Sequence, residues 1–144
     1  MKKIGEYTTR GQCPDNGKVR IKLFDGRFDT GYRVTKFVIA GVDTTSTTTP
    51  DCNGVLGTTE DAVSNQWDYS NNAQIAWSSL RAIDAGSLGD PFSNVDRDNM
   101  IVEDLFIYAN SNGGDAINYY IEMEKYDITD WQGALAMVRN RSQA

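Results

Sequence analysis

The sequence predicts a mainly β protein: an antiparallel β-sandwich, jelly-roll-like, with an extended N-terminal arm and one C-terminal α-helix. Three observations predict this class. Several short runs alternate apolar and polar residues, turn signals separate these runs, and Thr, Asn, Asp and Gly dominate the spaces between them. A chain of 144 residues that is 40% apolar has the size of one domain and can bury its own core.

The first elements are an arm and two strands. Residues 1–17 show little periodicity and end in the turn sequence Pro-Asp-Asn-Gly at 14–17, so we expect an N-terminal arm that closes in a turn. Residues 18–24 alternate basic and apolar side chains, as a half-buried strand does, and Asp-Gly at 25–26 is a turn signal. Residues 32–42 are long and β-branched and predict a second strand.

The middle of the chain is predicted to hold short strands between loops. The Thr-rich stretch 43–50 cannot bury a core and is expected to be a surface loop. Residues 54–59 predict a short strand. Residues 66–69 and 73–77 flank a polar turn and predict two more strands, whereas the Gly-, Ser- and Asp-rich stretch 85–98 predicts a loop.

The last third predicts a β-hairpin. Two alternating runs, 100–108 and 117–126, flank Asn-Ser-Asn-Gly-Gly at 110–114. In the second run every other residue is apolar, so one face is expected to be buried, and its members are Ile117, Tyr119, Ile121 and Met123. The sandwich is therefore expected to span residues 18–126.

A helix is predicted within 127–144, packed on the sandwich or on a neighbouring subunit. Thr-Asp-Trp-Gln at 129–132 fits a capping box. Trp131, Leu135 and Val138 then form one apolar stripe. A helix of about twelve residues is marginal alone, so it needs a surface to cover.

Charge is distributed unevenly along the chain. The formal net charge is −6, but residues 1–36 hold nine Lys and Arg against four acids, and residues 37–144 hold five against sixteen. One interpretation is a basic segment that docks onto an acidic surface of a partner or of a neighbouring copy. The alternative is a strand with one solvated, charged face. On the first interpretation the partner-binding residues are Lys2, Lys3, Arg10, Arg139 and Arg141.

Two classes of partner are disfavoured. Direct binding to nucleic acid is disfavoured because the chain is acidic, and contacts to phosphate groups require a surface rich in positive charge. No apolar run approaches the roughly twenty residues that span a bilayer. The opening residues 1–7 also lack the apolar stretch of a secretion signal.

The residues that carry chemistry do not assemble into a predicted active site. The chain has no histidine, which removes the commonest general base. Cys13 and Cys52 either form one disulfide or remain free thiols, and no Cys/His cluster suits a metal. We therefore expect no catalytic residue, no metal site and no cofactor.

Two groups of acidic residues suggest a site, and each also has a simpler interpretation as solvated surface. Residues 94–98 open like a calcium loop, but position six is Asn99 and position twelve is Leu105, which excludes an EF-hand. A looser site using Glu103 or Asp104 remains an alternative to a solvated turn. A second interpretation takes Glu103, Asp104, Glu122 and Glu124 as the source of a catalytic pair of carboxylates, as in a glycosidase. The simpler interpretation places Glu122 and Glu124 on the solvated face of one strand.

The aromatic residues allow a binding platform. Trp67 and Tyr69, beside Trp77, can stack on sugar rings or on another apolar face. The competing interpretation makes Trp77 and Trp131 core or interface anchors.

Several stretches, spread in order over most of the chain, form a recognisable set: Ile-Lys-Leu-Phe-Asp-Gly-Arg-Phe-Asp-Thr-Gly at 21–31, Gln-Ile-Ala-Trp at 74–77, residues 95–98 before 100–105, Trp-Gln-Gly-Ala at 131–134 and residues 138–143. These stretches give the chain a resemblance to a group of small proteins encoded by tailed phages of marine bacteria and cyanobacteria. It implies a virion component assembled in the host cytoplasm, a decoration or cement protein of the head, with a neck or tail component as the nearest variant. Its implied partners are the major capsid protein or other virion proteins, and copies of itself in a symmetric homo-oligomer.

Three functions therefore compete. The leading expectation is a non-enzymatic structural protein that binds the outside of the capsid and reinforces contacts between capsid subunits. The second is a glycan-binding β-sandwich module that uses Trp67 or Tyr69, and the third is a hydrolase with paired carboxylates.

Overall fold

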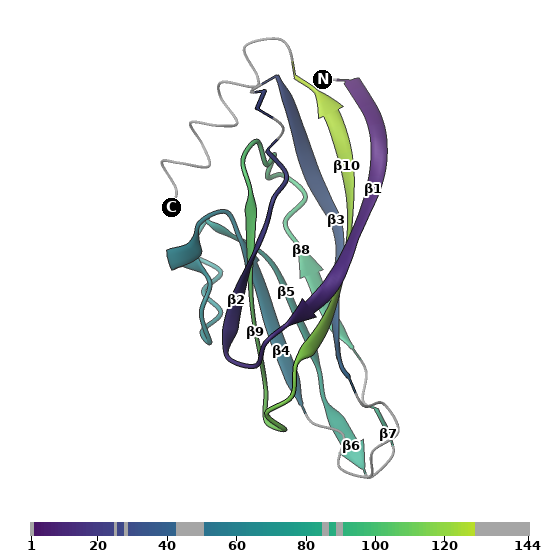
Figure 1. Cartoon of the computed structure of the whole chain (residues 1–144), viewed down its shortest axis with the longest axis vertical. Helices are drawn as coiled ribbons and strands as arrows, with labels where there is room; N and C mark the ends of the chain where they lie inside the picture. The colour runs from purple at the N-terminus through teal and green to yellow at the C-terminus, as the bar shows by residue number, and fades with distance from the viewer. Residues whose placement is uncertain are drawn as a thin grey trace.

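The chain folds mainly into β-strands (Figure 1). The computed structural model describes residues 2–24, 26–27, 29–42, 51–84, 87–88 and 91–128. Within these ranges there are ten strands and one short 3-10 helix, η1 (Glu60–Ala62), and no α-helix. We also find there no helix with the length and apolar character that crossing a bilayer requires.

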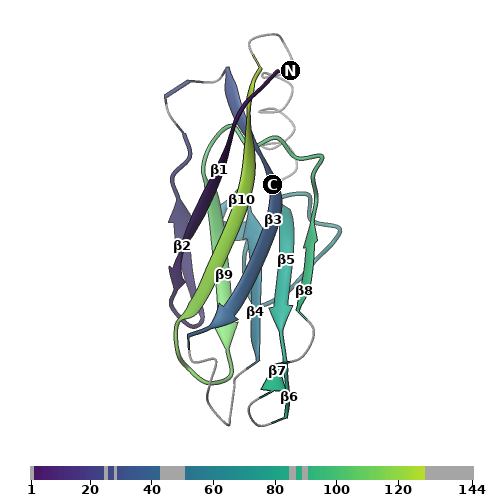
Figure 2. The same cartoon turned by 90° about the vertical axis from the view of Figure 1, so that its right-hand side faces the viewer.

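Two antiparallel sheets contain most of the strands. The first has the order β1 (Lys2–Cys13), β10 (Ile117–Asp127), β3 (Thr30–Gly41). The second has the order β2 (Gly17–Ile21), β9 (Leu105–Ser111), β4 (Cys52–Gly57), β5 (Gln74–Leu80), β8 (Phe92–Val95). A separate small pair joins β6 (Ala82–Asp84) to β7 (Ser87–Leu88). Figure 2 shows the three-stranded sheet in front of the five-stranded one.

The two sheets share one apolar core. Inward-facing side chains of both sheets form a single cluster, which includes Phe37, Ile39 and Ile121 from the first sheet and Leu56, Ile75 and Ile107 from the second. The sheets approach closely at Gly54 of β4, where an added Cβ would lie 3.3 Å from Phe37 and Ile39. Burying each such side chain contributes roughly 1.5–3 kcal/mol, so this cluster is the main source of stability.

The predicted turn at 14–17 is confirmed, and it carries the chain from one sheet to the other. The amide of Gly17 donates to the carbonyl of Pro14 at 3.0 Å, and Asn16 adopts a left-handed conformation with φ of 55°. Asn is one of the residues that tolerate this conformation. The carboxylate of Asp15 accepts the amide of Ser111 at 2.7 Å, which ties the turn to β9.

The expected extended N-terminal arm is instead a strand of the first sheet. Residues 2–13 form β1, which is aligned antiparallel with β10 from Lys2 opposite Asp127 to Cys13 opposite Ile117. The segment lacks a clear alternation because its inward positions include Thr9 and Gly11 rather than large apolar residues. Backbone pairing with β10 defines this strand, and a hydrophobic pattern does not reveal that pairing.

The predicted β-hairpin is also wrong, although a strand overlaps each of its two runs: β9 starts at Leu105 and reaches into the predicted turn, and β10 covers the second run. β9 pairs with β2 and β4, whereas β10 pairs with β1 and β3, so the Asn-Gly segment crosses between sheets. Each of these strands turns one apolar face toward the shared core. Two strands in opposed sheets produce this pattern as well as two paired strands of a hairpin do, so alternation alone does not distinguish the two arrangements. The predicted buried face of β10 is confirmed: Ile117, Ile121 and Met123 are at most 2% exposed, and Tyr119 packs against the same cluster.

Other predicted elements are confirmed in part. Strands β2, β3, β4 and β5 overlap the strands predicted at 18–24, 32–42, 54–59 and 73–77. Residues 66–69 are not a strand, and β8 lies inside a stretch predicted as loop. The Thr-rich loop at 43–50 and the helix predicted from residue 129 lie outside the described residues.

Candidate functional site

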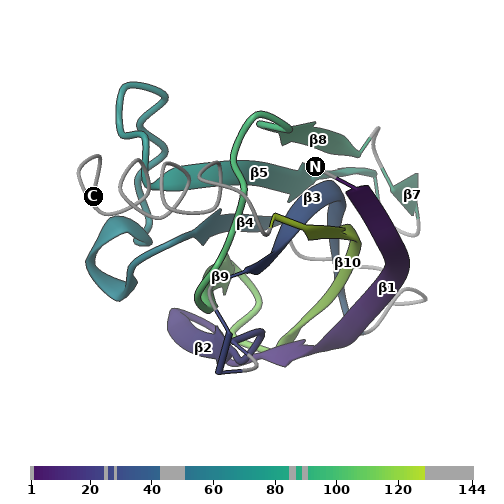
Figure 3. The same ribbon diagram turned by 90° about the horizontal axis from the view of Figure 1, so that it is seen from above.

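β1 is a long edge strand, and no strand in the described part of the chain pairs with its outer side. Seen from above in Figure 3, it runs along the outside of β10, away from β3. Ile4 and Tyr7 are 49% and 52% exposed on it, and the register with β10 shifts between Lys3 and Gly5. An open edge of this length can pair with another chain.

The opposite edge of the same sheet is better covered. The hydroxyl of Ser93, from β8, donates to the carbonyl of Phe37 at 2.5 Å. The guanidinium of Arg97 donates to the carbonyl of Thr35 at 3.1 Å. These side chains occupy backbone acceptors of β3, so β1 is the more accessible edge for a further strand.

The outer face of the three-stranded sheet is an ordered polar surface. The hydroxyl of Tyr126 donates to Glu124 at 3.0 Å, and the hydroxyl of Tyr120 donates to Glu122 at 2.9 Å. A cation lies over each ring: Arg33 is 5.1 Å from the centroid of Tyr126, and Lys36 lies 5.7 Å from that of Tyr120. Such contacts contribute roughly 0.5–1 kcal/mol each at exposed sites, and they fix the side chains in place.

The basic residues predicted to bind partners have different environments. Lys3 is already engaged, at 2.5 Å from Glu6 and 2.8 Å from Glu124. These hydrogen bonds raise the pKa of Lys3, and the bond from Lys3 lowers the pKa of Glu124. Lys2 is exposed at the start of β1. Arg139 and Arg141 lie outside the described residues.

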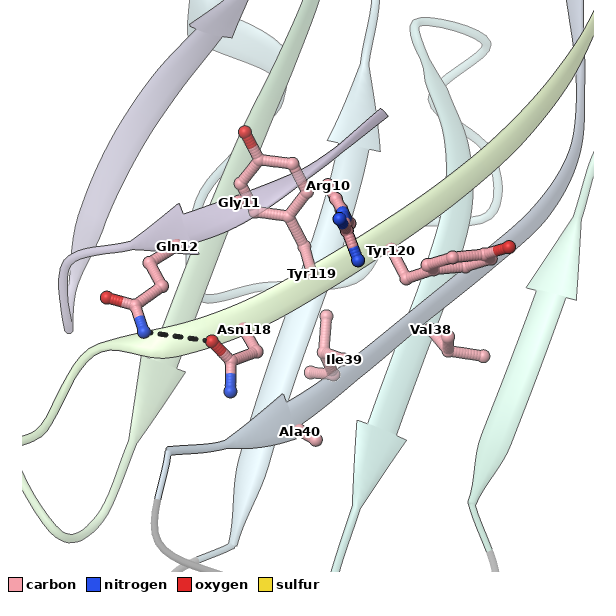
Figure 4. A pocket seen from close by; sticks show the side chains of 9 residues that line it. All are labelled: Arg10, Gly11, Gln12, Val38, Ile39, Ala40, Asn118, Tyr119 and Tyr120. Carbon is pink, nitrogen blue, oxygen red and sulfur yellow. Dashed lines mark hydrogen bonds between the residues drawn. The ribbon is translucent and has the colours of Figure 1, made fainter. Parts of the chain in front are cut away.

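Arg10 borders a groove of about 500 Å³ on the outer face (Figure 4). All three strands line it, with Arg10 from β1, Tyr120 from β10 and Val38 from β3 side by side. At one end the amide of Gln12 donates to Asn118 at 3.0 Å. Among the described residues nothing forms a hydrogen bond or ion pair with the Arg10 guanidinium.

The structure brings the two predicted platform aromatics, Trp67 and Tyr69, into one cluster. Trp67 stacks on Phe92, with ring centroids 5.7 Å apart and planes at 24°. Tyr69, which is 62% exposed, packs edge-on against Trp77 at 4.6 Å. Trp77 is itself 8% exposed, so the prediction that it is an anchor is confirmed, and Trp67 packs against the small apolar cluster that contains it.

A buried glutamine, which the sequence reasoning missed, holds this cluster. The carbonyl oxygen of Gln74 accepts the amide of Asp68 and the indole N–H of Trp77, both at 2.9 Å. Its side-chain amide donates to the carbonyls of Ala62 at 2.9 Å and Gln66 at 3.1 Å. The register shift between β4 and β5 places an extra residue, Ile75, on β5, which brings Gln74 within reach of Trp77. No sequence pattern signals this role.

Asp104 is a structural carboxylate. Its Oδ1 accepts the amides of Leu23 at 2.8 Å and Phe24 at 3.0 Å, and its Oδ2 accepts Nε of Arg20 at 2.7 Å. Burial raises the pKa of Asp104, but the two amides and the guanidinium outweigh burial and lower it below its usual value. The group is therefore held as an anion that fixes the chain after β2.

Two of the other candidate acids, Glu122 and Glu124, line a second, smaller groove. Glu6, Glu122 and Glu124 line a groove of about 350 Å³ together with Arg97. Each carboxylate already has a partner: Glu6 pairs with Lys3, Glu122 accepts a hydrogen bond from Tyr120, and Glu124 contacts both Lys3 and Tyr126. The lowered pKa of Glu124 is opposite to what a general acid needs, so this geometry does not favour paired-carboxylate hydrolysis.

The calcium-like stretch and the cysteines have local roles. The carboxylate of Asp96 accepts the amide of Asp98 at 3.0 Å and the side chain of Asn99 at 2.6 Å, closing a turn. No group of three metal-ligating side chains occurs in the ranges that the structure describes. Cys13 and Cys52 are both free thiols and fully buried.

Comparison with known proteins finds no matching family model, no similar curated protein and no similar solved structure. The functional argument therefore rests on the surfaces described above.

Proposed function

We propose that this chain is a non-enzymatic structural protein of a tailed phage particle, a decoration or cement protein that binds outside the head and reinforces contacts between capsid subunits. A neck or tail component is the nearest variant of this proposal. In the same proposal the two sheets form a jelly-roll-like sandwich, and the predicted C-terminal helix packs on this sandwich or on a neighbouring subunit.

One observation supports this role above the others. The accessible β1 edge offers a neighbouring chain a row of backbone donors and acceptors, and adding a strand to an edge is a recurrent mode of recognition. Repetition over a symmetric shell multiplies contacts that are individually weak. The sequence resemblance points to the same kind of particle.

Counting copies in purified particles tests the proposal. Quantitative mass spectrometry is expected to find the protein in hundreds of copies per particle, as a shell component requires. A dozen copies would support the neck or tail variant. Absence from purified particles would overturn the proposal.

A charge placed on the β1 edge tests the surface. The variant Ile4→Lys adds a charge at an exposed apolar position of β1, and Val42→Lys does the same at a position of similar exposure beyond β3. We expect Ile4→Lys to lower occupancy on particles severalfold while Val42→Lys leaves it unchanged. Equal occupancy of both variants would remove the β1 edge from the proposal.

A second candidate function is glycan binding, which the aromatic cluster favours. Tyr69 presents an exposed ring on Trp77, and Trp67, stacked on Phe92, packs against the cluster that contains Trp77. Aromatic faces of this kind pack against sugar rings. Affinity electrophoresis in gels that contain soluble polysaccharides would show retardation that is lost in Tyr69→Ala and kept in Tyr7→Ala, an exposed tyrosine outside the cluster. Unretarded migration of the wild-type protein in all gels would exclude this function.

A further inference from the structure

β1 has the properties of a self-complementary edge. One side of the strand is aligned with β10 along its length, and the other side has no partner strand among the described residues. When two identical edges pair antiparallel, a two-fold axis perpendicular to the sheet relates them, and every contact occurs twice. Such pairing would join two three-stranded sheets into one sheet of six strands.

The alternation of faces limits the registers that such a pair can adopt. Glu6, Thr8, Arg10 and Gln12 lie on the outer face, since they are aligned with the outer-face residues of β10. Residues directly opposite one another in a sheet point to the same side. The two-fold axis must therefore pass through a residue position, and outer-face residues meet outer-face residues.

Charge selects one of these registers. An axis at Glu6 would place two glutamates face to face, and axes at Tyr7 or Thr9 would leave the charges of Glu6 and Arg10 opposite uncharged residues. An axis at Thr8 places Glu6 opposite the partner's Arg10 and Arg10 opposite the partner's Glu6. Opposite charges in directly facing positions stabilise a pair, and like charges destabilise it.

We propose that two copies of this chain form a symmetric dimer through antiparallel β1 strands, centred on Thr8. Two further observations agree with this register. The Arg10 guanidinium has no hydrogen-bond or salt-bridge partner within the described residues of its own chain. Tyr7, which is 52% exposed, would be covered by the partner's Thr9 on the inner side of the joined sheet.

This dimer deepens the proposed structural role, since it names the partner of the β1 edge, and it can be tested without particles. Sedimentation equilibrium should give a dimer mass that falls toward the monomer mass on dilution. Arg10→Glu should raise the dissociation constant about tenfold or more, because it turns two attractive pairs into two repulsive ones. The double variant Glu6→Arg with Arg10→Glu should restore most of the affinity.

A matched control separates pairing from net charge. Lys22→Glu makes the same change in net charge at an exposed position outside β1, and it should leave the dissociation constant unchanged. Equal weakening by Lys22→Glu and Arg10→Glu, or no rescue by the double variant, would overturn the Glu6–Arg10 register.

A cysteine on the axis tests the register directly. Thr8→Cys places two thiols opposite each other and should form a disulfide-linked dimer under mild oxidation. Gln12→Cys, also exposed on the outer face, would lie away from its symmetry mate and should stay unlinked. The native thiols of Cys13 and Cys52 are fully buried, so we expect them to crosslink much more slowly than the introduced thiol.

The outcomes of the two sets of experiments are separable. A monomer mass at all concentrations, or equal crosslinking of Thr8→Cys and Gln12→Cys, overturns the dimer whatever the copy number on particles. A stable dimer that is absent from particles overturns the proposed function and leaves the dimer standing.

Discussion

Replacing the buried Gln74 by leucine tests whether this side chain organises the aromatic cluster. Gln74 is 4% exposed, and its side chain makes four hydrogen bonds, two accepted and two donated. Leucine keeps the approximate volume but satisfies none of these partners. The segment that carries Trp67 and Tyr69 would lose its two hydrogen bonds to the Gln74 side chain of β5.

The expected cost follows from the burial of the four partners. The bonds to the carbonyl of Ala62 and the indole of Trp77 are buried, and the other two are partly buried, where water can substitute. A buried polar group left without a partner costs roughly 1–3 kcal/mol. Two such groups, offset in part by the added apolar surface, give a loss of about 3 kcal/mol in the free energy of unfolding.

Urea unfolding, followed by tryptophan fluorescence, measures this loss. Gln66→Leu is the matched control, because Gln66 is exposed and contributes only its backbone carbonyl to the network. We expect the control to stay within about 0.5 kcal/mol of the wild-type value. A Gln74→Leu protein less than 1 kcal/mol below the control would refute the assigned role.

Two further predictions concern buried groups elsewhere. Asp104→Ala should lower the free energy of unfolding by about 2–3 kcal/mol at neutral pH, and Arg20→Ala by under about 1 kcal/mol because that arginine is 60% exposed. Since the pKa of Asp104 is lowered in the fold, its contribution is present above about pH 4 and is lost as pH falls through the native pKa. Urea unfolding from pH 7 to pH 2 should therefore show the gap between wild type and Asp104→Ala narrowing in acid, and a constant gap would contradict this. Burial raises the pKa of the Cys13 and Cys52 thiols, so both should react with a disulfide reagent slowly in the native protein and at once in urea. If the protein, denatured without a reducing agent, showed no thiols that react with the reagent, the assignment of Cys13 and Cys52 as free thiols would be wrong.

Local chemistry was enough to predict several elements. The turn at 14–17 follows from Pro, Asn and Gly, whose conformational preferences act within four residues. The buried face of β10 follows from strict alternation, since a strand that covers a core must place apolar residues at every second position. Alternation likewise located much of β2, and a β-branched run located much of β3.

The candidate surfaces were predicted less completely. Exposed aromatic residues at Trp67 and Tyr69 were recognisable as a platform, and the structure does bring them together. The role of Gln74 was not recognisable, because a buried glutamine resembles a surface one until its four partners are assembled around it. Asp104 likewise acts through amides that lie 80 and 81 residues away in the sequence.

The sequence by itself determined that this chain is mainly β and which positions of its clearest strands face the core, since periodicity and turn propensity are properties of neighbouring residues. Only the tertiary structure decided that β9 and β10 belong to different sheets and that residues 2–13 are an edge strand rather than an arm. Strand partners are chosen by backbone hydrogen bonds between distant segments, and those bonds leave no pattern in either segment. The β1 edge, on which both proposals depend, is therefore a feature of the assembled sheet.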